Sequence, residues 1–194
     1  VILSGEGADE IFTGYARYMP IYMQWKLKKR YPSYDYLFSK FYTSYHDGYA
    51  KLTSRNEENF ELIKRTMKKY FEMFENPVTA MCFFDFKIIM PSLLQMGDRM
   101  SSAFGIENRC PFLDKDIIEF GFNLDVNQKI DFNQQKLILR NILKNRLNSR
   151  YSEIEKKGLT IKFNSWFHSK SWDRTKYFQF LFKKWRQSYK VKSY

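Results

Sequence analysis

A short segment near the start of the sequence combines acidic residues and glycines, the residue types of a phosphate or metal site. Residues 4–10 read SGEGADE and fall where an apolar run ends and a helical pattern begins. Glycine lets the backbone approach a ligand closely, and free N–H groups at a helix N-terminus attract a phosphate. Glu6, Asp9 and Glu10 would repel a naked phosphate, so a polyphosphate fits only with a divalent cation between them. Alternatively, Asp9 and Glu10 only complement the helix dipole.

A second group of charged residues lies in an apolar, small-residue setting between residues 90 and 114. It contains Asp98, Arg99, Glu107 and Arg109. Charges in such a setting are normally paired, because burying one alone costs several kcal/mol. We expect Asp98 to pair with an arginine, and Glu107 to pair with Arg109 or a neighbour. These pairs either brace a helix junction or present the carboxylate and amine of an amino acid.

A polar loop further along the chain offers a third chemical group. Lys156 and Lys157 stand just before Gly158 in the sequence EKKGLT. A lysine on a mobile loop can close over a polyphosphate and neutralise the charge that develops on a leaving group. A pair of lysines in a loop is also an ordinary solvated surface feature, and both interpretations stay open.

A mainly helical chain that begins with one strand must position these segments. The apolar start of residues 1–4 predicts a strand, and a lone strand cannot satisfy its own hydrogen bonds. We expect the other strands of its sheet to be absent from this chain, which we interpret as a fragment. Apolar residues at spacings of three and four predict helices over residues 59–74, 116–122 and 133–147. Residues 148–157 are polar and predict a loop.

The composition is that of a folded globular protein with an uneven basic charge. Of the 194 residues, 44% are hydrophobic and 28% are charged, and the formal net charge is +12. Residues 151–194 carry 11 Lys and Arg against 3 Asp and Glu, so most of the excess lies in this part. Aromatic residues alternate with basic ones there, which indicates either a contact with nucleic acid or an acidic membrane, or a solvated helix face.

Several classes of protein are excluded. No stretch approaches the roughly 18 apolar residues of a membrane span, and no signal peptide opens the chain, so we expect a cytoplasmic location. Cys82 and Cys110 have neither zinc-site nor disulfide-framework spacing and are expected to pack in the core. His46 and His168 have no partner at metal-ligand spacing.

Four segments in this order resemble one known family. The synthetase domain of glutamine-dependent asparagine synthetases has blocks similar to VILSGEGADEIFTGY, MPSLLQMGDRMSSAFGIENRCPFLD, KLILRNILKNRL and EKKGLTIKFNSWF. The matching blocks cover about half of the chain, between residues 1 and 167, and residues 19–78 match none of them. We take residues 1–167 as the family-like portion and residues 168–194 as a basic aromatic tail, helical or partly disordered. It implies the C-terminal portion of an α/β adenine-nucleotide α-hydrolase-like (ATP pyrophosphatase) domain, mainly helical here with one N-terminal strand.

The resemblance also implies a ligase that uses ATP and Mg²⁺. In that family ATP adenylates the side-chain carboxylate of aspartate, pyrophosphate leaves, and glutamine-derived ammonia displaces AMP to give asparagine. Carried over by position, Ser4 and Gly5 would contact ATP, and Glu6 would lie beside the reacting carboxylate and ammonia. Asp9 would bind the magnesium on the pyrophosphate, and Lys156 would stabilise that leaving group.

The sequence departs from the family pattern in places. Asp98 and Arg99 match the block near the family's substrate pocket, where binding and bracing are not separated by sequence. Thr13 stands where the family usually has a second glycine. Ile154 and Glu155 precede the loop lysine where Arg and Pro are commoner.

Two family features do not occur in these residues: an SGGxDS loop that holds the ATP phosphates and an N-terminal cysteine that hydrolyses glutamine. We therefore expect the missing N-terminal synthetase half and a glutaminase domain as partners, with aspartate and ammonia as substrates. We expect no membrane or nucleic-acid partner, and a homodimer is compatible with the sequence. We expect the chain alone to be inactive. The alternatives are a related amide-forming synthetase or cyclase that acts on another carboxylate, and a non-catalytic fragment that acts as a binding module.

Overall fold

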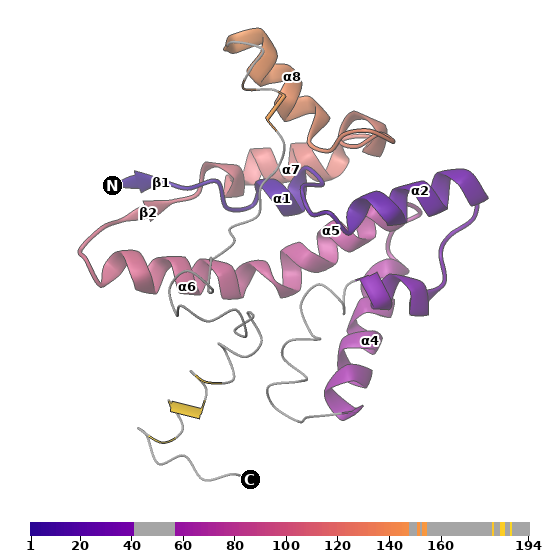
Figure 1. Ribbon diagram of the computed structural model, residues 1–194, viewed down its shortest axis with the longest axis horizontal. Helices are drawn as coiled ribbons and strands as arrows, with labels where there is room; N and C mark the ends of the chain where they lie inside the picture. Colours follow the sequence, from indigo (N-terminus) through magenta and orange to yellow (C-terminus); the bar gives the residue numbers. More distant parts are fainter. Residues whose placement is uncertain are drawn as a thin grey trace.

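The computed structural model describes residues 1–40 and 57–147, together with residues 151, 153, 154, 180, 183, 184 and 187. These residues are mostly helical, as expected (Figure 1). The helices are α1 (Ala8–Ile11), α2 (Tyr18–Lys28), α4 (Glu57–Phe71), α5 (Pro77–Ile88), α6 (Met90–Ser102), α7 (Lys115–Asn123) and α8 (Leu137–Arg146). Residues 34–40 are also helical, and short 3-10 turns span Pro111–Leu113 and Val126–Gln128.

The predicted N-terminal strand forms, and its partner lies within the chain. Strand β1 (Ile2–Leu3) pairs in parallel with β2 (Asn108–Arg109), and the Ile2 N–H donates to the Glu107 carbonyl at 2.8 Å. The expectation of a single strand is therefore wrong, because β2 is too short and polar to show a strand pattern. Val1 and Leu3 remain 77% and 73% exposed.

Helix α5 is the centre of the fold. It contacts α1, α2, α4 and α6 and is buried along most of its length. Its first turn is capped by Asn76, whose side chain accepts hydrogen bonds from the N–H groups of Val78 and Thr79, and Pro77 starts the helix with a fixed φ angle. The largest fully buried apolar side chains of the described residues are Ile11, Tyr18, Ile21, Leu37, Met67, Phe71, Met81, Phe84, Met90 and Ile130.

One buried ion pair joins α5 to the segment that follows α1. Nη2 of Arg17 lies 2.6 Å from Oδ2 of Asp85, and Nε of Arg17 and the hydroxyl of Tyr18 also donate to that oxygen. The Asp85 side chain is fully buried, and burial raises its pKa while the Arg17 guanidinium opposes this shift. The pair fixes the entry of α2 against the centre of α5.

The structure tests the three helices that periodicity predicted. The helix predicted over residues 59–74 is confirmed by α4, and the helix predicted over residues 116–122 lies within α7. The helix predicted over residues 133–147 is shorter than expected, because α8 begins only at Leu137 after a turn. The predicted loop over residues 148–157 and the tail over residues 168–194 lie largely outside the described residues, and the four described tail residues are helical.

The two cysteines differ in their surroundings. Cys82 lies in α5 and is fully buried, and burial raises its pKa to about 12. Cys110 is only half-buried, with its Sγ 3.2 Å from Oγ of Ser4, so the expectation of core packing is wrong for this residue. It follows β2 and faces the loop after β1. His46 and His168 lie outside the described residues.

Among the helices that the structure describes, none alone has the length and apolar composition of a membrane span. Helices α5 and α6 meet that test only when they are joined across a bend of 41°.

Replacing Asp85 by alanine is expected to lower the free energy of unfolding by about 3 to 5 kcal/mol, because the Arg17 guanidinium then stays buried without this carboxylate. Urea denaturation followed by circular dichroism measures the change. The control is Asp35→Ala, which removes an exposed carboxylate 3.7 Å from Lys64 and should cost less than about 1 kcal/mol. Equal losses in the two variants would contradict the importance of the buried pair.

Candidate active site

The loop between β1 and α1 carries the first group of predicted site residues. Ser4 continues β1, with its N–H donating to the Arg109 carbonyl at 2.9 Å. Gly7 has a φ of 91°, which strains any other residue, and a Cβ there would also lie 2.4 Å from a methyl carbon of Leu113. At Gly5 a Cβ would meet nothing within 4 Å, because this side of the loop faces open space.

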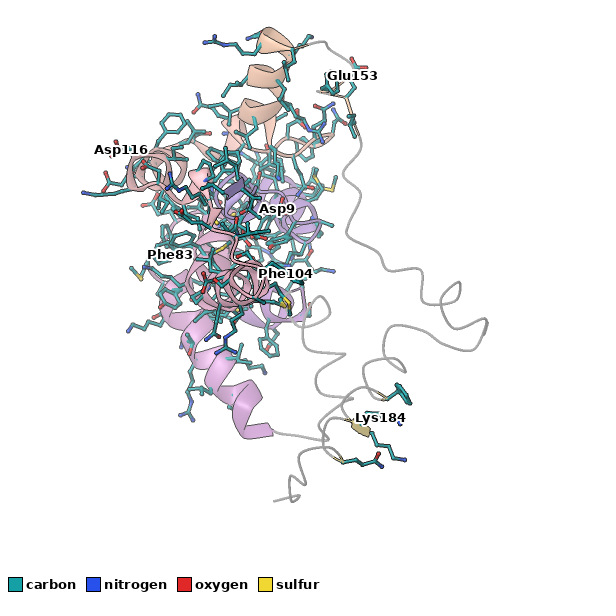
Figure 2. The ribbon with its side chains drawn as sticks, turned by 90° about the vertical axis from the view of Figure 1, so that its left-hand side faces the viewer. Asp9, Phe83, Phe104, Asp116, Glu153 and Lys184 are labelled. Atoms are coloured by element: carbon teal, nitrogen blue, oxygen red, sulfur yellow. The ribbon has the colours of Figure 1, made fainter. Side chains whose placement is uncertain are left out.

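The open side of the loop belongs to a cavity of about 730 Å³. Gly5 and Ala8 line it from the loop and the start of α1, and Leu139, Arg140 and Leu143 line it from α8. In Figure 1 α8 stands on the far side of α7 from α6, and Figure 2 shows Glu153 beside α8 while Asp9 lies within the group of helices. The other lining residues are Gly14, Met19, Phe112, Asn133, Gln134, Gln135, Lys136, Tyr151, Glu153 and Ile154.

An ion pair joins the lining residue Lys136 to Asp9. Nζ of Lys136 is 2.6 Å from Oδ1 of Asp9, and each side chain is 27% exposed. The two side chains meet over Gly14, where a Cβ would lie 1.8 Å from Oδ1 of Asp9 and 2.3 Å from Cε of Lys136. The pair therefore depends on a glycine at position 14.

A tight turn before α8 delivers Lys136 to this place. Oδ1 of Asp131 accepts hydrogen bonds from the N–H groups of Asn133 and Gln134, which closes the turn. Lys136 itself has a φ of 57°, in the left-handed region that non-glycine residues seldom adopt. The side-chain amide of Gln135 donates to the Tyr15 carbonyl at 2.7 Å and ties the turn to the segment after α1.

Tyr15 also contacts Glu10, the acidic residue that follows Asp9. Its hydroxyl donates to Oε1 of Glu10 at 2.5 Å, and the Arg17 guanidinium lies 4.3 Å from the centre of its ring. Glu10 is buried, and this burial raises the pKa of its carboxyl. Tyr15 is thus bonded to the residue after Asp9 and to the residue before Lys136.

Arg140 connects α8 to the outer wall of the cavity. Its Nε donates to the Gln135 carbonyl at 2.9 Å, and its Nη1 donates to the Ile154 carbonyl at 3.2 Å. The guanidinium therefore ties the turn before α8 to the short described stretch that contains Tyr151 and Glu153.

The structure brings only some of the predicted site residues together. Ser4, Gly5, Glu6 and Asp9 share one loop and the short helix α1, but only Gly5 among them lines the cavity. Lys156 lies outside the described residues.

The predicted substrate-pocket residues on α6 lie elsewhere. Asp98 and Arg99 are exposed and line no part of the cavity. The expected pairing of Asp98 with an arginine does not occur among the described residues, where the Asp98 carboxylate accepts a long hydrogen bond from Ser102 at 3.5 Å. The expected pair of Glu107 and Arg109 does form, at 2.8 Å, but on the exposed surface, where the Arg109 hydrogen bond lowers the pKa of Glu107.

The side chains at this site could hold a metal ion only together with phosphate groups that supply further oxygen ligands. No cluster of three His, Cys, Asp or Glu side chains occurs in the part of the chain that the structure describes. Mg²⁺ bound together with phosphates needs only one or two carboxylates. Asp9 offers one carboxylate beside the cavity, although Lys136 occupies it in this structure.

The sequence did not identify the two cavity cations, Lys136 and Arg140. One feature could have indicated Lys136: it is a cation at the start of a helix, where the helix dipole disfavours positive charge. In this structure its partner is Asp9.

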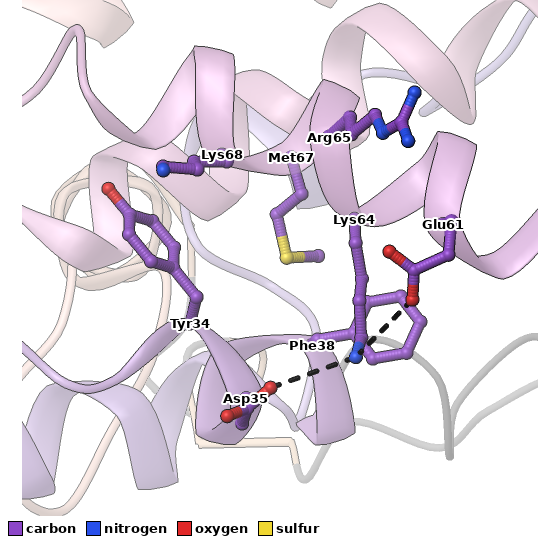
Figure 3. A pocket seen from close by; sticks show the side chains of 8 residues that line it. All are labelled: Tyr34, Asp35, Phe38, Glu61, Lys64, Arg65, Met67 and Lys68. Carbon is purple, nitrogen blue, oxygen red and sulfur yellow. Dashed lines mark ion pairs between the residues drawn. The ribbon is translucent and has the colours of Figure 1, made fainter.

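A second, smaller cavity of about 210 Å³ lies between residues 34–40 and α4 (Figure 3). Lys64 spans it with ion pairs to Asp35 at 3.7 Å and Glu61 at 3.9 Å. None of its lining residues lines the first cavity or belongs to the predicted site.

Comparisons with known proteins agree on one family. Residues 1–178 match the family model described as asparagine synthase. A curated protein of Methanocaldococcus jannaschii, named "Putative asparagine synthetase (glutamine-hydrolyzing) 1", is 26% identical over 130 residues. The match covers 67% of this chain but only 15% of that relative, so the chain spans a small part of its length. No solved structure matches.

Replacing Gly14 by alanine is expected to lower the free energy of unfolding by about 1 to 3 kcal/mol, because the new methyl overlaps Asp9 and Lys136. Thermal or urea unfolding measures the loss. Gly5→Ala is the matched control, since its methyl enters open space and should change stability by less than about 0.5 kcal/mol. Similar losses at both positions would argue against the close approach at Gly14.

The buried Glu10 carboxyl predicts a specific pH dependence of stability. Its pKa in the folded chain is raised above the ordinary 4.5, so its favourable contribution is present at low pH and is lost as pH rises through the raised value. Glu10→Gln should therefore gain stability relative to wild type between about pH 4 and pH 7. Urea unfolding across this range tests it, with Glu75→Gln controlling for the loss of one exposed negative charge. If the difference in the free energy of unfolding between Glu10→Gln and the wild type stays constant with pH, the prediction is refuted.

Proposed function

This chain belongs to the asparagine synthase family, and we propose that it forms the C-terminal part of a synthetase that uses ATP to adenylate the side-chain carboxylate of aspartate. Pyrophosphate leaves in this step, and glutamine-derived ammonia then displaces AMP to give asparagine. The rest of the protein would supply the ATP-binding loop and the glutaminase domain, because the chain corresponds to 15% of its relative's length.

One observation carries this proposal: the cavity between the SGEGADE loop and α8. A polyphosphate carries several negative charges, and Lys136 and Arg140 provide two cations on the α8 wall. Gly5 also lines the cavity, and its backbone can approach a ligand without a side chain between. Fixed cations around a leaving pyrophosphate stabilise the charge that develops during adenylate formation.

The remaining residues take roles within this scheme. Ser4 and Gly5 contact the nucleotide, and Glu6, half-buried in the loop, lies near the reacting carboxylate and the ammonia. Asp9 would hold a magnesium ion, which neutralises phosphate charge when it is bound. Lys156 adds a further cation from the segment that follows Ile154.

A second candidate function differs only in the acceptor. Asp98 and Arg99 were candidates for the substrate pocket, yet both are exposed on α6 and do not line the cavity. The described residues therefore favour no particular acceptor, and an amide-forming synthetase or cyclase that acts on another carboxylate uses the same phosphate chemistry.

Aspartate-dependent release of pyrophosphate from ATP by the full-length protein tests the proposed function. Lys156→Met should lower kcat for this release by about 10² to 10³ and leave KM for aspartate nearly unchanged, because its cation acts on the leaving group. Lys144→Met removes an exposed cation on α8 and is the control. Release that requires another acid favours the second candidate, and no release with any acid favours a non-catalytic binding module.

A further inference from the structure

Thr13, just after the end of α1, is held in a backbone conformation that its side chain disfavours. Its φ angle is 61°, and the residue is fully buried. Left-handed backbone is costly for a residue branched at Cβ, whereas glycine adopts it without strain. Such strain persists only where the surrounding structure holds it, and strained residues cluster at functional sites. The Thr13 side chain is therefore expected to supply a contact that glycine lacks.

The Thr13 hydroxyl makes a buried contact with a distant part of the chain. Its Oγ1 lies 3.0 Å from the carbonyl oxygen of Lys129 and 2.6 Å from that of Phe12, so its one hydrogen is shared between two acceptors. The Lys129 carbonyl also accepts the N–H of Leu137 at 3.0 Å, which occupies both of its lone pairs. One buried oxygen thus joins the end of α1 to the start of α8.

The Lys129 carbonyl closes the base of the turn that carries Lys136. Within this turn Ile130 pairs antiparallel with Gln135, so the chain reverses between them. Lys136 follows directly and precedes the Leu137 N–H that is bound at the base. A shift of the base therefore moves the Lys136 side chain, which lines the cavity.

The side chain of Lys129 fixes the same base to α7. It is fully buried, and its Nζ donates to the Gly121 carbonyl in the last turn of α7 at 2.8 Å. The negative end of the helix dipole lies there and favours a cation. A Cβ at Gly121 would lie 2.1 Å from a methyl carbon of Ile11, so α7 approaches α1 closely at this residue. The base of the turn is thus anchored on α7 by Lys129 and on the end of α1 by Thr13.

A second link reaches this turn from the segment after α1. The Gln135 side-chain amide donates to the Tyr15 carbonyl at 2.7 Å, in a bond that is only partly buried. The bond from Thr13 to Lys129 is buried. Loss of the Thr13 hydroxyl should therefore loosen the turn without releasing it.

We propose that Thr13 is a positioning residue whose hydroxyl sets the place of Lys136 at the cavity. It acts through the Lys129 carbonyl and touches no ligand itself. Glycine at position 13 would relieve the strain but would remove this donor. The inference rests on the proposed function for the use of the Lys136 cation, and it adds the residue that holds that cation in place.

Three substitutions separate the hydroxyl of Thr13 from its shape and its strain. Thr13→Ser keeps the hydroxyl, Thr13→Val keeps the shape without it, and Thr13→Gly relieves the strain without it. In the full-length protein, Thr13→Val and Thr13→Gly should each lower kcat for aspartate-dependent pyrophosphate release about tenfold, because Lys136 is displaced from the leaving group. KM for aspartate should stay nearly unchanged, and Thr13→Ser should retain most of the wild-type kcat.

Thermal unfolding of the same variants distinguishes positioning from a purely structural role. Because glycine relieves the strain, Thr13→Gly should melt no lower than Thr13→Val, although both lose activity. If Thr13 positions Lys136, kcat follows the presence of the hydroxyl across the three variants. If kcat follows the melting temperature instead, the inference is refuted.

Hydrogen exchange followed by mass spectrometry reports on the turn without any reaction. Peptides that contain residues 129–137 should exchange faster in Thr13→Val and Thr13→Gly than in the wild type and Thr13→Ser, because the turn has lost an anchor. Thr66→Val is the matched control. Its hydroxyl bonds the Leu62 carbonyl within α4 at 2.9 Å, so its loss should change neither this exchange nor kcat.

The outcomes separate this inference from the proposed function. Unchanged exchange of residues 129–137 in both variants without the hydroxyl refutes the inference, and so does an intact kcat in Thr13→Val. If the exchange rises as expected but the wild type releases no pyrophosphate with any acid, the positioning of Lys136 is supported and the proposed reaction fails.

Discussion

The buried contact between Arg17 and Asp85 is the constraint on which the rest of the described structure depends. Asp85 is a charged residue on α5, a helix otherwise packed almost wholly among apolar side chains. Charges in such a place are costly unless paired, so the segment after α1 must stay where Arg17 reaches that carboxylate. Arg17 also stacks on Tyr15, and Tyr15 positions the residues beside Asp9 and Lys136. The geometry of the candidate site thus follows from a contact inside the helical core.

Local sequence patterns predicted the helices whose apolar residues recur at helical spacing. The helix α4 follows from apolar residues at spacings of three and four, and its buried Met67 and Phe71 lie on the predicted face. Strand β2 escaped prediction because Asn108 and Arg109 are polar, and a two-residue strand exists only through its pairing with β1. The start of α8 was predicted too early. The hydrogen bonds of the Asp131 side chain determine where the preceding turn closes, and apolar periodicity does not reveal them.

The candidate site could be predicted only in part, for a related reason. The loop with Ser4 and Gly5 was recognised from residue types that are adjacent in sequence. The pair of Asp9 and Lys136 joins residues far apart in the chain, and only the fold brings them within 2.6 Å. Asp98 and Arg99 show the opposite error, since their apolar sequence neighbours suggested burial whereas α6 exposes both side chains. Sequence neighbours describe a residue's surroundings poorly when the surroundings come from other elements.

The short parallel pair of β1 and β2 affects how this chain associates with other strands. Parallel strands are normally covered on both faces, yet Val1 and Leu3 are largely exposed here. The outer edge of a strand carries N–H and C=O groups that accept a further strand. An edge that is both apolar and able to bond acts as a template: it recruits a matching strand from the same polypeptide when one is present, and it favours self-association in concentrated solution when none is. Covering this edge is therefore expected to lower the tendency of the chain to self-associate.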